Sequence, residues 1–414
     1  MPLYSQSRAV ASLAALYIFR MLGLFMVLPI LSLSADDYSG STVFLLGVAL
    51  GIYGLTQALL QIPFGMLSDR FGRKPLIFIG LLLFTLGSCI AAYSDSIVGL
   101  IVGRALQGAG AIAGVIMAMV GDLTTEQNRT KAMATIGASI GVAFALSLII
   151  GPWVSGFDVM GVTGVRLLFC VIIVLAIISM AILWRFIPSV SRPSAELGGE
   201  PKALSWVSLN NVLKKPQCIP LYVGVFALHY VLMAFFVVIP GLLEQVSIVR
   251  EQHSLVYLGV MLCSFIMMVP LMIWAEKKQQ VKTFLIVMSL LIIMALTGLL
   301  LGMINLFNVV VAIGVFFVGF NYIEANLPSL LTKILPSHQR GAGSGVFATS
   351  QFLGAALGGI IGGWLYANIG LLATFGSAAA LMLLWLIVVV KMKMPARILK
   401  DVPEAQNTTV EPTL

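Results

Sequence analysis

Charged side chains are scarce in this chain, since Asp, Glu, Lys and Arg make up only 10% of its 414 residues and hydrophobic residues make up 60%. A soluble globular domain carries about 25% charged residues. The solvent for most of the chain is therefore lipid. Lipid requires every backbone group to be paired within the protein, and the apolar runs are long enough for spanning helices. The sequence predicts an all-α polytopic membrane protein.

Cysteine and histidine are also sparse, with four and three residues. The cysteines fall singly in separate apolar segments, without CxxC spacing, which argues against disulfide or metal roles. There is no HExxH pair, no Walker loop and no Ser/His/Asp constellation, so an enzyme has little support. No metal and no cofactor are expected. The cysteines, expected to be packing residues, are Cys89, Cys170, Cys218 and Cys263.

The net charge of +8 does not indicate a nucleic-acid partner, because the Lys and Arg residues lie in short clusters between apolar runs. Most of these clusters fall in alternate loops, which share one side of the membrane with both termini. Only Arg166 and Arg250 fall in loops of the other side. Since Lys and Arg stay on the cytoplasmic side during insertion, both termini are predicted to be cytoplasmic.

Each span needs roughly 20 apolar residues to cross a bilayer core of about 30 Å. The first apolar run is too long for the hydrophobic region of a signal peptide, about 7–15 residues, and is expected to remain as a helix. The predicted spans are residues 9–33, 42–67, 75–94, 97–120, 131–155, 163–187, 218–243, 253–274, 282–303, 306–332, 341–367 and 370–391.

A polar segment near mid-chain divides the sequence into similar halves. At a shift of 211 residues, the run from Arg129 aligns without gaps to the run from Arg340. Parallel repeats of this kind are found in transporters. Within the polar segment, residues 204–215 favour either a short helix on the inner leaflet or a solvated linker. The predicted parts are residues 1–187, a first six-helix bundle; 188–217, a cytoplasmic linker; 218–391, a second six-helix bundle; and 392–414, a short cytoplasmic tail.

The loop after the second span contains a glycine, three residues, an aspartate, a base, one residue, a glycine and two bases. This pattern resembles the cytoplasmic signature of the major facilitator superfamily, a family of transporters. The glycines permit a tight connection between helices, and the charges fix the cytoplasmic end. The residues are Gly65, Asp69, Arg70, Gly72, Arg73 and Lys74.

The resemblance implies a conformational latch, in which Asp69 and Arg73 form a charge cluster with the acid that ends the fourth span, here Asp122. It also implies that the positive end of the helix beginning near Gly341 approaches Asp69, a contact that would favour the outward-open state. The second-half counterpart, residues 275–280, lacks the aspartate and the glycines, so symmetric latching is not expected.

Two further motifs support the resemblance, which covers nearly the whole chain. Arg104, Gln107, Gly108 and Gly110 in the fourth span resemble the family's second motif. The fifth span resembles the motif of its drug:proton antiporters, in which glycines allow close helix packing and a proline removes a backbone bond. Ser155 departs from that motif, which weakens the case for exchange over symport. The motif residues are Gly137, Gly141, Gly151, Pro152 and Gly156.

Ionisable residues within the spans are functional candidates, because charge in lipid is costly. Glu324 is the only acid well inside a predicted span, and His229 lies in the seventh. Burial disfavours the charged form of both, so either could carry a proton. Arg20 and Arg104 could tune that proton. Local hydrogen bonding or a purely structural role is the alternative for Glu324, His229 and Arg104.

Polar side chains identify a candidate substrate cavity. Tyr53, Gln57 and Gln61 follow one face of the second span at four-residue spacing, and Asn321 and Gln351 could join them from the other half. Such side chains could instead only hold helices together. The lack of a dense acidic cluster argues against a metal-ion pathway, and the many Phe, Met and Leu residues would suit an amphipathic organic substrate.

Together these features predict a major facilitator fold of twelve spanning helices in two six-helix bundles. The expected function is proton-coupled transport that exports drugs or other small organic compounds across a bacterial inner membrane, with protons and the lipid bilayer as the other partners. Import of a small metabolite by proton symport is the alternative, since a fold does not fix function. A sensor without transport activity is a further one. The chain is expected to act as a monomer.

Overall fold

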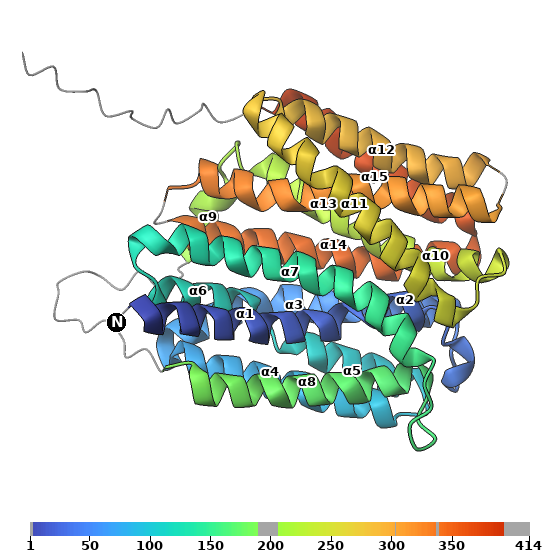
Figure 1. Ribbon diagram of the computed structural model, residues 1–414, viewed down its shortest axis with the longest axis horizontal. Coiled ribbons are helices and arrows are strands. Elements are labelled where there is room, and N and C mark those ends of the chain that lie inside the picture. The colour runs from blue at the N-terminus through green and yellow to red at the C-terminus, as the bar shows by residue number, and fades with distance from the viewer. Residues whose placement is uncertain (1–2, 189–205, 303, 337–338, 393–414) are drawn as a thin grey trace, which may run out of the picture.

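The computed structural model describes residues 3–188, 206–302, 304–336 and 339–392, and these residues form long, nearly parallel helices (Figure 1). Two short 3-10 helices, η1 at Ala35–Asp37 and η3 at Arg250–Gln252, precede α3 and α11. The α-helices are α1 Leu3–Phe25, α2 Leu28–Leu31, α3 Val43–Phe71, α4 Arg73–Tyr93, α5 Ile97–Ala109, α6 Ala113–Leu123, α7 Glu126–Ser155, α8 Gly164–Phe186, α9 Trp206–Leu213, α10 Ile219–Gln245, α11 His253–Lys277, α12 Val281–Leu301, α13 Leu306–Ile334, α14 Arg340–Asn368 and α15 Leu371–Lys391.

Twelve segments of the described residues are long and apolar enough to span a membrane. The prediction of a twelve-span, all-α membrane protein is therefore confirmed. The predicted ends are within four residues of the membrane-spanning segments, and the largest difference is at α3, which continues to Phe71 rather than residue 67. As helices, α1 and α7 begin earlier than predicted, at Leu3 and Glu126.

Two spans contain breaks that the sequence analysis did not predict. The first span consists of α1 and α2, which meet just before Pro29. Proline cannot donate a backbone hydrogen bond, which accounts for the interruption. The fourth span consists of α5 and α6, which are separated at Gly110, where the backbone lies directly against that of Gly80 in α4.

The helices of residues 3–188 lie together on one side of the molecule and those of residues 219–392 on the other (Figure 1). Corresponding helices pack alike in the two halves. Gly151 of α7 contacts the backbone of Met26, which follows α1, and Gly362 of α14 contacts Ala234 of α10. The repeat detected in the sequence therefore also relates the packing of the two halves.

A pair of lysines occupies equivalent positions in this repeat. Lys74, in the first turn of α4, donates hydrogen bonds to the carbonyl oxygens of Trp184 and Ile187 at the end of α8. Lys282, in the first turn of α12, donates one to the carbonyl oxygen of Val390 at the end of α15. A cation at a helix C-terminus satisfies free carbonyls and opposes the negative end of the helix dipole.

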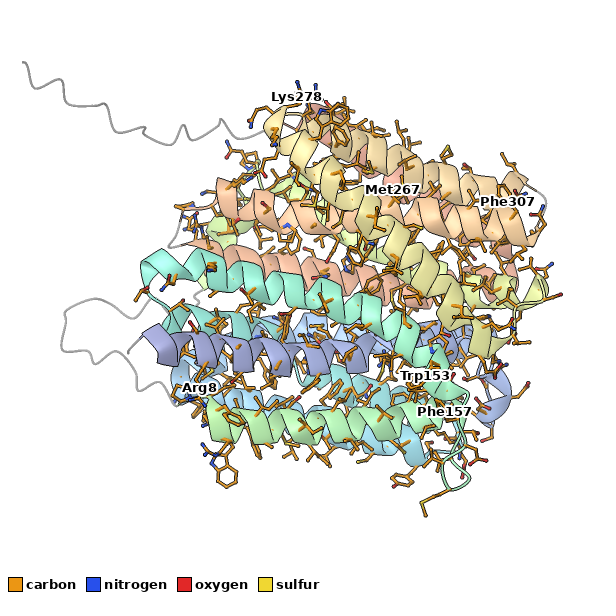
Figure 2. All side chains as sticks on the ribbon, in the orientation of Figure 1. Arg8, Trp153, Phe157, Met267, Lys278 and Phe307 are labelled. Atoms are coloured by element: carbon orange, nitrogen blue, oxygen red, sulfur yellow. The ribbon has the colours of Figure 1, made fainter. Side chains whose placement is uncertain are left out.

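The two ends of the molecule differ in the side chains that they present. Arg8 and Lys278 lie at one end, here named the basic end, whereas Trp153, Phe157 and Phe307 lie at the opposite end, here named the far end (Figure 2). The helices α3 and α13 run from the far end to the basic end, and α14 runs back.

The two halves meet most closely along α3 and α14, here named the seam. Backbone contacts without intervening side chains occur in its far half, where Gly47 of α3 lies against Gly363 and Gly51 lies against Ala356. At the basic end of α14, a methyl group placed on Gly341 or Gly345 would meet no atom of the described residues within 4 Å. The seam is thus closely packed in its far half, and these two glycines at the basic end make no comparable close contact with the described residues.

The short helix α9 lies within the region predicted as either a membrane-surface helix or a solvated linker. Its Leu209 and Val212 side chains are buried, and Val212 lies close to Gly343 near the start of α14. The next turn is fixed by a hydrogen bond of 2.7 Å from Lys215 to Gln339. Residues 209–215 therefore pack on the protein. The rest of the predicted linker, residues 189–205, and most of the predicted tail, residues 393–414, lie outside the described residues.

Candidate functional site

Three polar side chains from three helices meet inside the second half: His229 of α10, Glu324 of α13 and Gln351 of α14. We name this group the acid–histidine site. The Gln351 side-chain nitrogen lies 2.8 Å from Nε2 of His229 and 3.3 Å from Oε1 of Glu324. The Glu324 Oε2 atom lies 3.8 Å from His229 Nε2. The structure therefore joins the two predicted proton carriers through a residue that had been predicted only to line a cavity.

The hydrogen bonds of His229 define which of its nitrogens can take up a proton. Its Nδ1 lies 3.0 Å from the carbonyl oxygen of Val225 and must carry a hydrogen to bond it. In the neutral ring, Nε2 then accepts the hydrogen bond from Gln351. When Nε2 is protonated it becomes a donor, so the amide of Gln351 must turn or the ring must bond Glu324 instead. Proton uptake thus changes a contact made by α14.

The two ionisable side chains of the acid–histidine site differ in exposure. The Glu324 side chain is 26% exposed, compared with 7% for His229. One turn of α13 toward the far end, Phe320 is buried, and its ring centroid lies 5.9 Å from that of His229. Rings from both halves surround Phe320, with Phe144 of α7 at 5.6 Å and Phe25 at 5.0 Å from Phe144. These aromatic rings pack on the far-end side of the site.

A second polar group lies in the first half and is here named the arginine cluster: Arg20 of α1, Tyr53 and Gln57 of α3, and Arg104 of α5. Arg20 donates hydrogen bonds from Nη2 to the Tyr53 hydroxyl at 3.2 Å and to Gln57 Oε1 at 3.1 Å. The Arg104 guanidinium carbon lies 4.9 Å from the centroid of the Tyr53 ring, a cation–π contact. The predicted cavity face of α3 therefore holds both buried arginines.

Arg104 also has a structural role, which the sequence analysis had left open. It donates to the carbonyl oxygen of Ala49 at 3.2 Å and to Gln107 at 3.0 Å, and Gln107 donates to Ser88 of α4 at 2.7 Å. Sequence reasoning missed Ser88 and the Ala49 carbonyl. A single serine in an apolar helix, like any backbone oxygen, carries no distinguishing pattern.

The remaining cavity candidates lie apart from these two groups. The Asn321 amide of α13 donates to Ser264 of α11 at 2.7 Å. Gln61 lies one turn of α3 beyond Gln57, beside Gly114 of α6, and neither atom of its amide has a hydrogen-bond partner among the described residues. The described residues also contain no group of three or more His, Cys, Asp or Glu side chains placed to hold a metal ion.

The predicted latch residues Asp69, Arg73 and Asp122 come together at the basic end. Arg73 forms ion pairs with Asp69 and, at 3.0 Å, with Asp122. Its Nη1 atom also donates to the Ser68 hydroxyl at 2.6 Å. Gly72, between α3 and α4, has a φ of 99°, a conformation that a side chain would strain. The predicted approach of α14 to Asp69 stays a prediction.

The other latch residues lie around this cluster. The Gly65 carbonyl oxygen accepts a hydrogen bond from Ser68 at 2.7 Å, and Arg70 lies over the ring of Phe71. In the second half, Lys333 at the end of α13 pairs with Glu276 at the end of α11, at 3.0 Å. Both of these side chains are more than half exposed, so this pair contributes little. Among the described residues, the ion pairs around Arg73 are thus less exposed than their second-half counterpart.

The antiporter-type motif of α7 is partly engaged in close packing. Gly151 contacts Met26, and Pro152 follows it within the helix. Gly156 lies against the side chain of Glu251 in η3, across the boundary between the two halves at the far end. A methyl group on Gly141 would meet no atom of the described residues within 4 Å. Within the described part of the chain, Gly151 and Gly156 thus make close contacts that Gly141 does not.

We expect Arg73→Gln to slow transport about fivefold. The variant leaves Asp69 and Asp122 without the cation that they share. The lost interaction free energy is about 1 kcal/mol after allowance for the exposure of Asp122. This loss corresponds to roughly a fivefold change in the ratio of two conformations. Initial transport rates in proteoliposomes measure the effect. Arg185→Gln, which removes an exposed arginine at the end of α8, is the matched control. Equal rates in the two variants would contradict a role for the latch.

Comparison with known proteins identifies the family. A sequence model described as Major Facilitator Superfamily matches residues 13–349 and 221–412. The chain is 43% identical over 395 residues to the inner membrane transport protein YajR of Escherichia coli K12, covering 94% of this chain and 84% of YajR. It is 26% identical over 383 residues to the multidrug resistance protein MdtH of Yersinia pestis, covering 88% and 89%.

Solved structures agree on the fold. The human organic anion transporter MFSD10 superposes with a TM-score of 0.68 at 16% identity, covering 94% of this chain and 100% of that one. The similar relatives are transporters rather than enzymes, and the twelve spans make the chain a multi-pass membrane protein. By its sequence, its spans and its two similar halves, the chain belongs to the major facilitator superfamily.

Proposed function

We propose that this protein is a proton-coupled secondary transporter that exports drugs or other small organic compounds. The observation that carries the proposal is the acid–histidine site, in which Glu324 and His229 are both joined to Gln351. An ionisable pair within spanning helices is a candidate proton relay. Its connection to α14, the helix that forms the seam with the first half, gives proton uptake a route to the conformation of the whole molecule.

The coupling follows from the hydrogen bonds. With His229 neutral, Gln351 bonds both His229 and Glu324 and holds α14 against α10 and α13. Protonation of His229 at Nε2 removes the acceptor that Gln351 bonds there, so Gln351 must find another partner. Protonation of Glu324 leaves a carbonyl oxygen for Gln351 but turns the other oxygen into a donor that can compete for His229 Nε2. A proton shifts the equilibrium between the inward-open and outward-open conformations only if these two conformations bind it with different affinity. Rocking of the two bundles about the seam then exposes the substrate site to each side in turn.

The proposed membrane is the bacterial inner membrane, with the basic end and both termini in the cytoplasm. The excess of Lys and Arg at that end agrees with the side on which such residues remain during insertion. The name of YajR places that relative in the inner membrane. In this orientation, the closely packed far half of the seam faces the periplasm.

The nature of the substrate is proposed from the surroundings of the acid–histidine site. Phe25, Phe144 and Phe320 line its far-end side, and apolar walls with a few polar groups are typical of sites for organic ligands. The name of MdtH assigns drug resistance to that relative. The chain is proposed to act as a monomer, because each copy contains both bundles.

Transport by proteoliposomes tests the proposal. The purified protein is reconstituted, a pH gradient is imposed, and the movement of a panel of fluorescent organic compounds is followed. We expect at least one compound to move against its concentration gradient and opposite to the protons, with about tenfold accumulation for each exchanged proton per pH unit. Movement in the same direction as the protons would support the import alternative. Transport that ignores the pH gradient would refute proton coupling.

A further inference from the structure

We infer that the arginine cluster is a binding site for a small anion or for a compact anionic group, such as a carboxylate, of a transported compound. The inference starts from the charge of the cluster. Arg20 and Arg104 are 1% and 0% exposed, and neither forms an ion pair with a described acid. Both contact Tyr53: Arg20 bonds its hydroxyl, and Arg104 lies over the face of its ring. Two positive charges therefore share a small buried volume without a negative charge.

The sequence shows why the first half cannot supply that charge from within its spans. Its acids are in the segments between helices or at helix ends, and the acids of the latch are at the basic end. A buried guanidinium without a counter-charge is costly in a membrane protein and is a functional candidate for that reason. An anion that neutralises the two arginines must therefore come from outside the spans of the first half.

The hydrogen-bonding groups of the cluster have a matching imbalance. Among the described residues, four buried nitrogen atoms of the cluster lack a hydrogen-bond acceptor: Arg20 Nε, Arg20 Nη1, Arg104 Nη2 and Gln57 Nε2. All four are donors. The acceptors that are present, the Tyr53 hydroxyl and Gln57 Oε1, already bond Arg20 Nη2. A ligand that completes the cluster must supply lone pairs and negative charge, whereas water supplies only the lone pairs.

The surroundings limit the size of the ligand. Arg20 also lies 5.2 Å from the centroid of the Phe84 ring, and the Tyr53 and Gln57 side chains are buried. A compact anion such as chloride, or one carboxylate, fits this chemistry better than a large polyanion. If the bound anion is free chloride, the inference is independent of the proposed function. If it is the carboxylate of an exported compound, the inference rests on the proposed function.

The test is the thermal stability of the purified full-length protein in nanodiscs at constant pH and ionic strength. Chloride or acetate replaces a bulky sulfonate, and the unfolding midpoint is read from tryptophan fluorescence. A ligand that binds only the folded state raises the midpoint in a saturable way. We expect this rise in the wild type, a reduced rise in Arg20→Lys, and none in Arg20→Gln. Arg166→Gln, which removes an arginine paired with Asp95 at the far end, is the matched control and should keep the full response.

The sign of the effect without a compact anion separates a binding site from a structural arginine. In the sulfonate buffer, Arg20→Gln should unfold at the wild-type temperature or above it, because the variant removes an unneutralised buried charge. A structural arginine would give a lower midpoint. A response to chloride identifies a free inorganic anion, and a response to acetate alone identifies the carboxylate of a compound. Both support the site.

A direct measurement of anion binding provides the test if Arg20→Gln does not fold. Radiolabelled chloride and acetate are measured by equilibrium dialysis against the wild-type protein and Gln57→Leu. Saturable binding that weakens at least tenfold in Gln57→Leu supports the site. The absence of saturable binding to the wild type, or an equal stability response in wild type and Arg20→Gln, overturns it. Neither result depends on a pH gradient, so failure of this inference and failure of the proposed function are distinguishable.

Discussion

Glu324→Gln is expected to abolish accumulation driven by a pH gradient while leaving the protein folded. The glutamine side chain has nearly the same shape and can still bond Gln351, but it cannot bind and release a proton. Each coupled proton contributes about 1.4 kcal/mol per pH unit, which is about tenfold in accumulation. The variant should therefore move a transported compound only down its own gradient. Uptake into proteoliposomes with and without an imposed pH gradient measures this loss.

The matched control is Glu276→Gln, which neutralises another acid of the second half. Glu276 is largely exposed at the basic end and pairs with Lys333, so this variant should keep pH-driven accumulation. Thermal unfolding of both variants checks that they fold. Glu324→Gln proteoliposomes that still accumulate the compound tenfold per pH unit would remove Glu324 from proton coupling.

Gly51→Ala is expected to block transport by holding the far half of the seam apart. A methyl group on Gly51 would collide with the carbonyl oxygen of Ala356 and with Ile360 on α14. Overpacking of this kind costs about 1–3 kcal/mol, and only the conformation with a closed far half bears the cost. The population of that conformation should fall by roughly one to two orders of magnitude. The initial transport rate measures the change. A second measure is the reactivity toward a water-soluble thiol reagent of a single cysteine that replaces Phe44.

Gly314→Ala is the control for this experiment. Gly314 lies within α13, where an added methyl group would meet no described atom within 4 Å. The control variant makes the same chemical change in a spanning helix and should transport at the wild-type rate. If Gly51→Ala transported as fast as Gly314→Ala, close contact along the seam would not be required for the cycle.

The sequence predicted the features that depend on neighbouring residues. The spans follow from the length of the apolar runs, and the Arg73 cluster follows from a motif whose members lie in one short loop, with Asp122 placed by the family resemblance. The alignment of Tyr53 and Gln57 follows from four-residue spacing on one helix face. In each case, local spacing determines which side chains share a surface.

The features that were missed depend on which helices pack together. His229, Glu324 and Gln351 come from three helices, and no spacing rule indicates that Gln351 lies between the other two. Arg20 was expected to act with the proton carriers, and the structure places it against Tyr53, Gln57 and Phe84 of the first half. The break at Gly110 results from close approach to Gly80, which only the packing of α4 against α5 defines.

The central claim is that the proton on the acid–histidine site determines which end of the seam is open. Distances between spin labels across the two halves, measured as a function of pH, test it most directly. In a cysteine-free background, one pair of labels replaces Trp184 and Lys278 at the basic end, and a second pair replaces Met160 and Leu301 at the far end, all exposed positions. We predict that one distance lengthens as the other shortens across the titration, and that Glu324→Gln abolishes this pH dependence. Distances that do not change with pH, or that change equally in Glu324→Gln, would contradict the account.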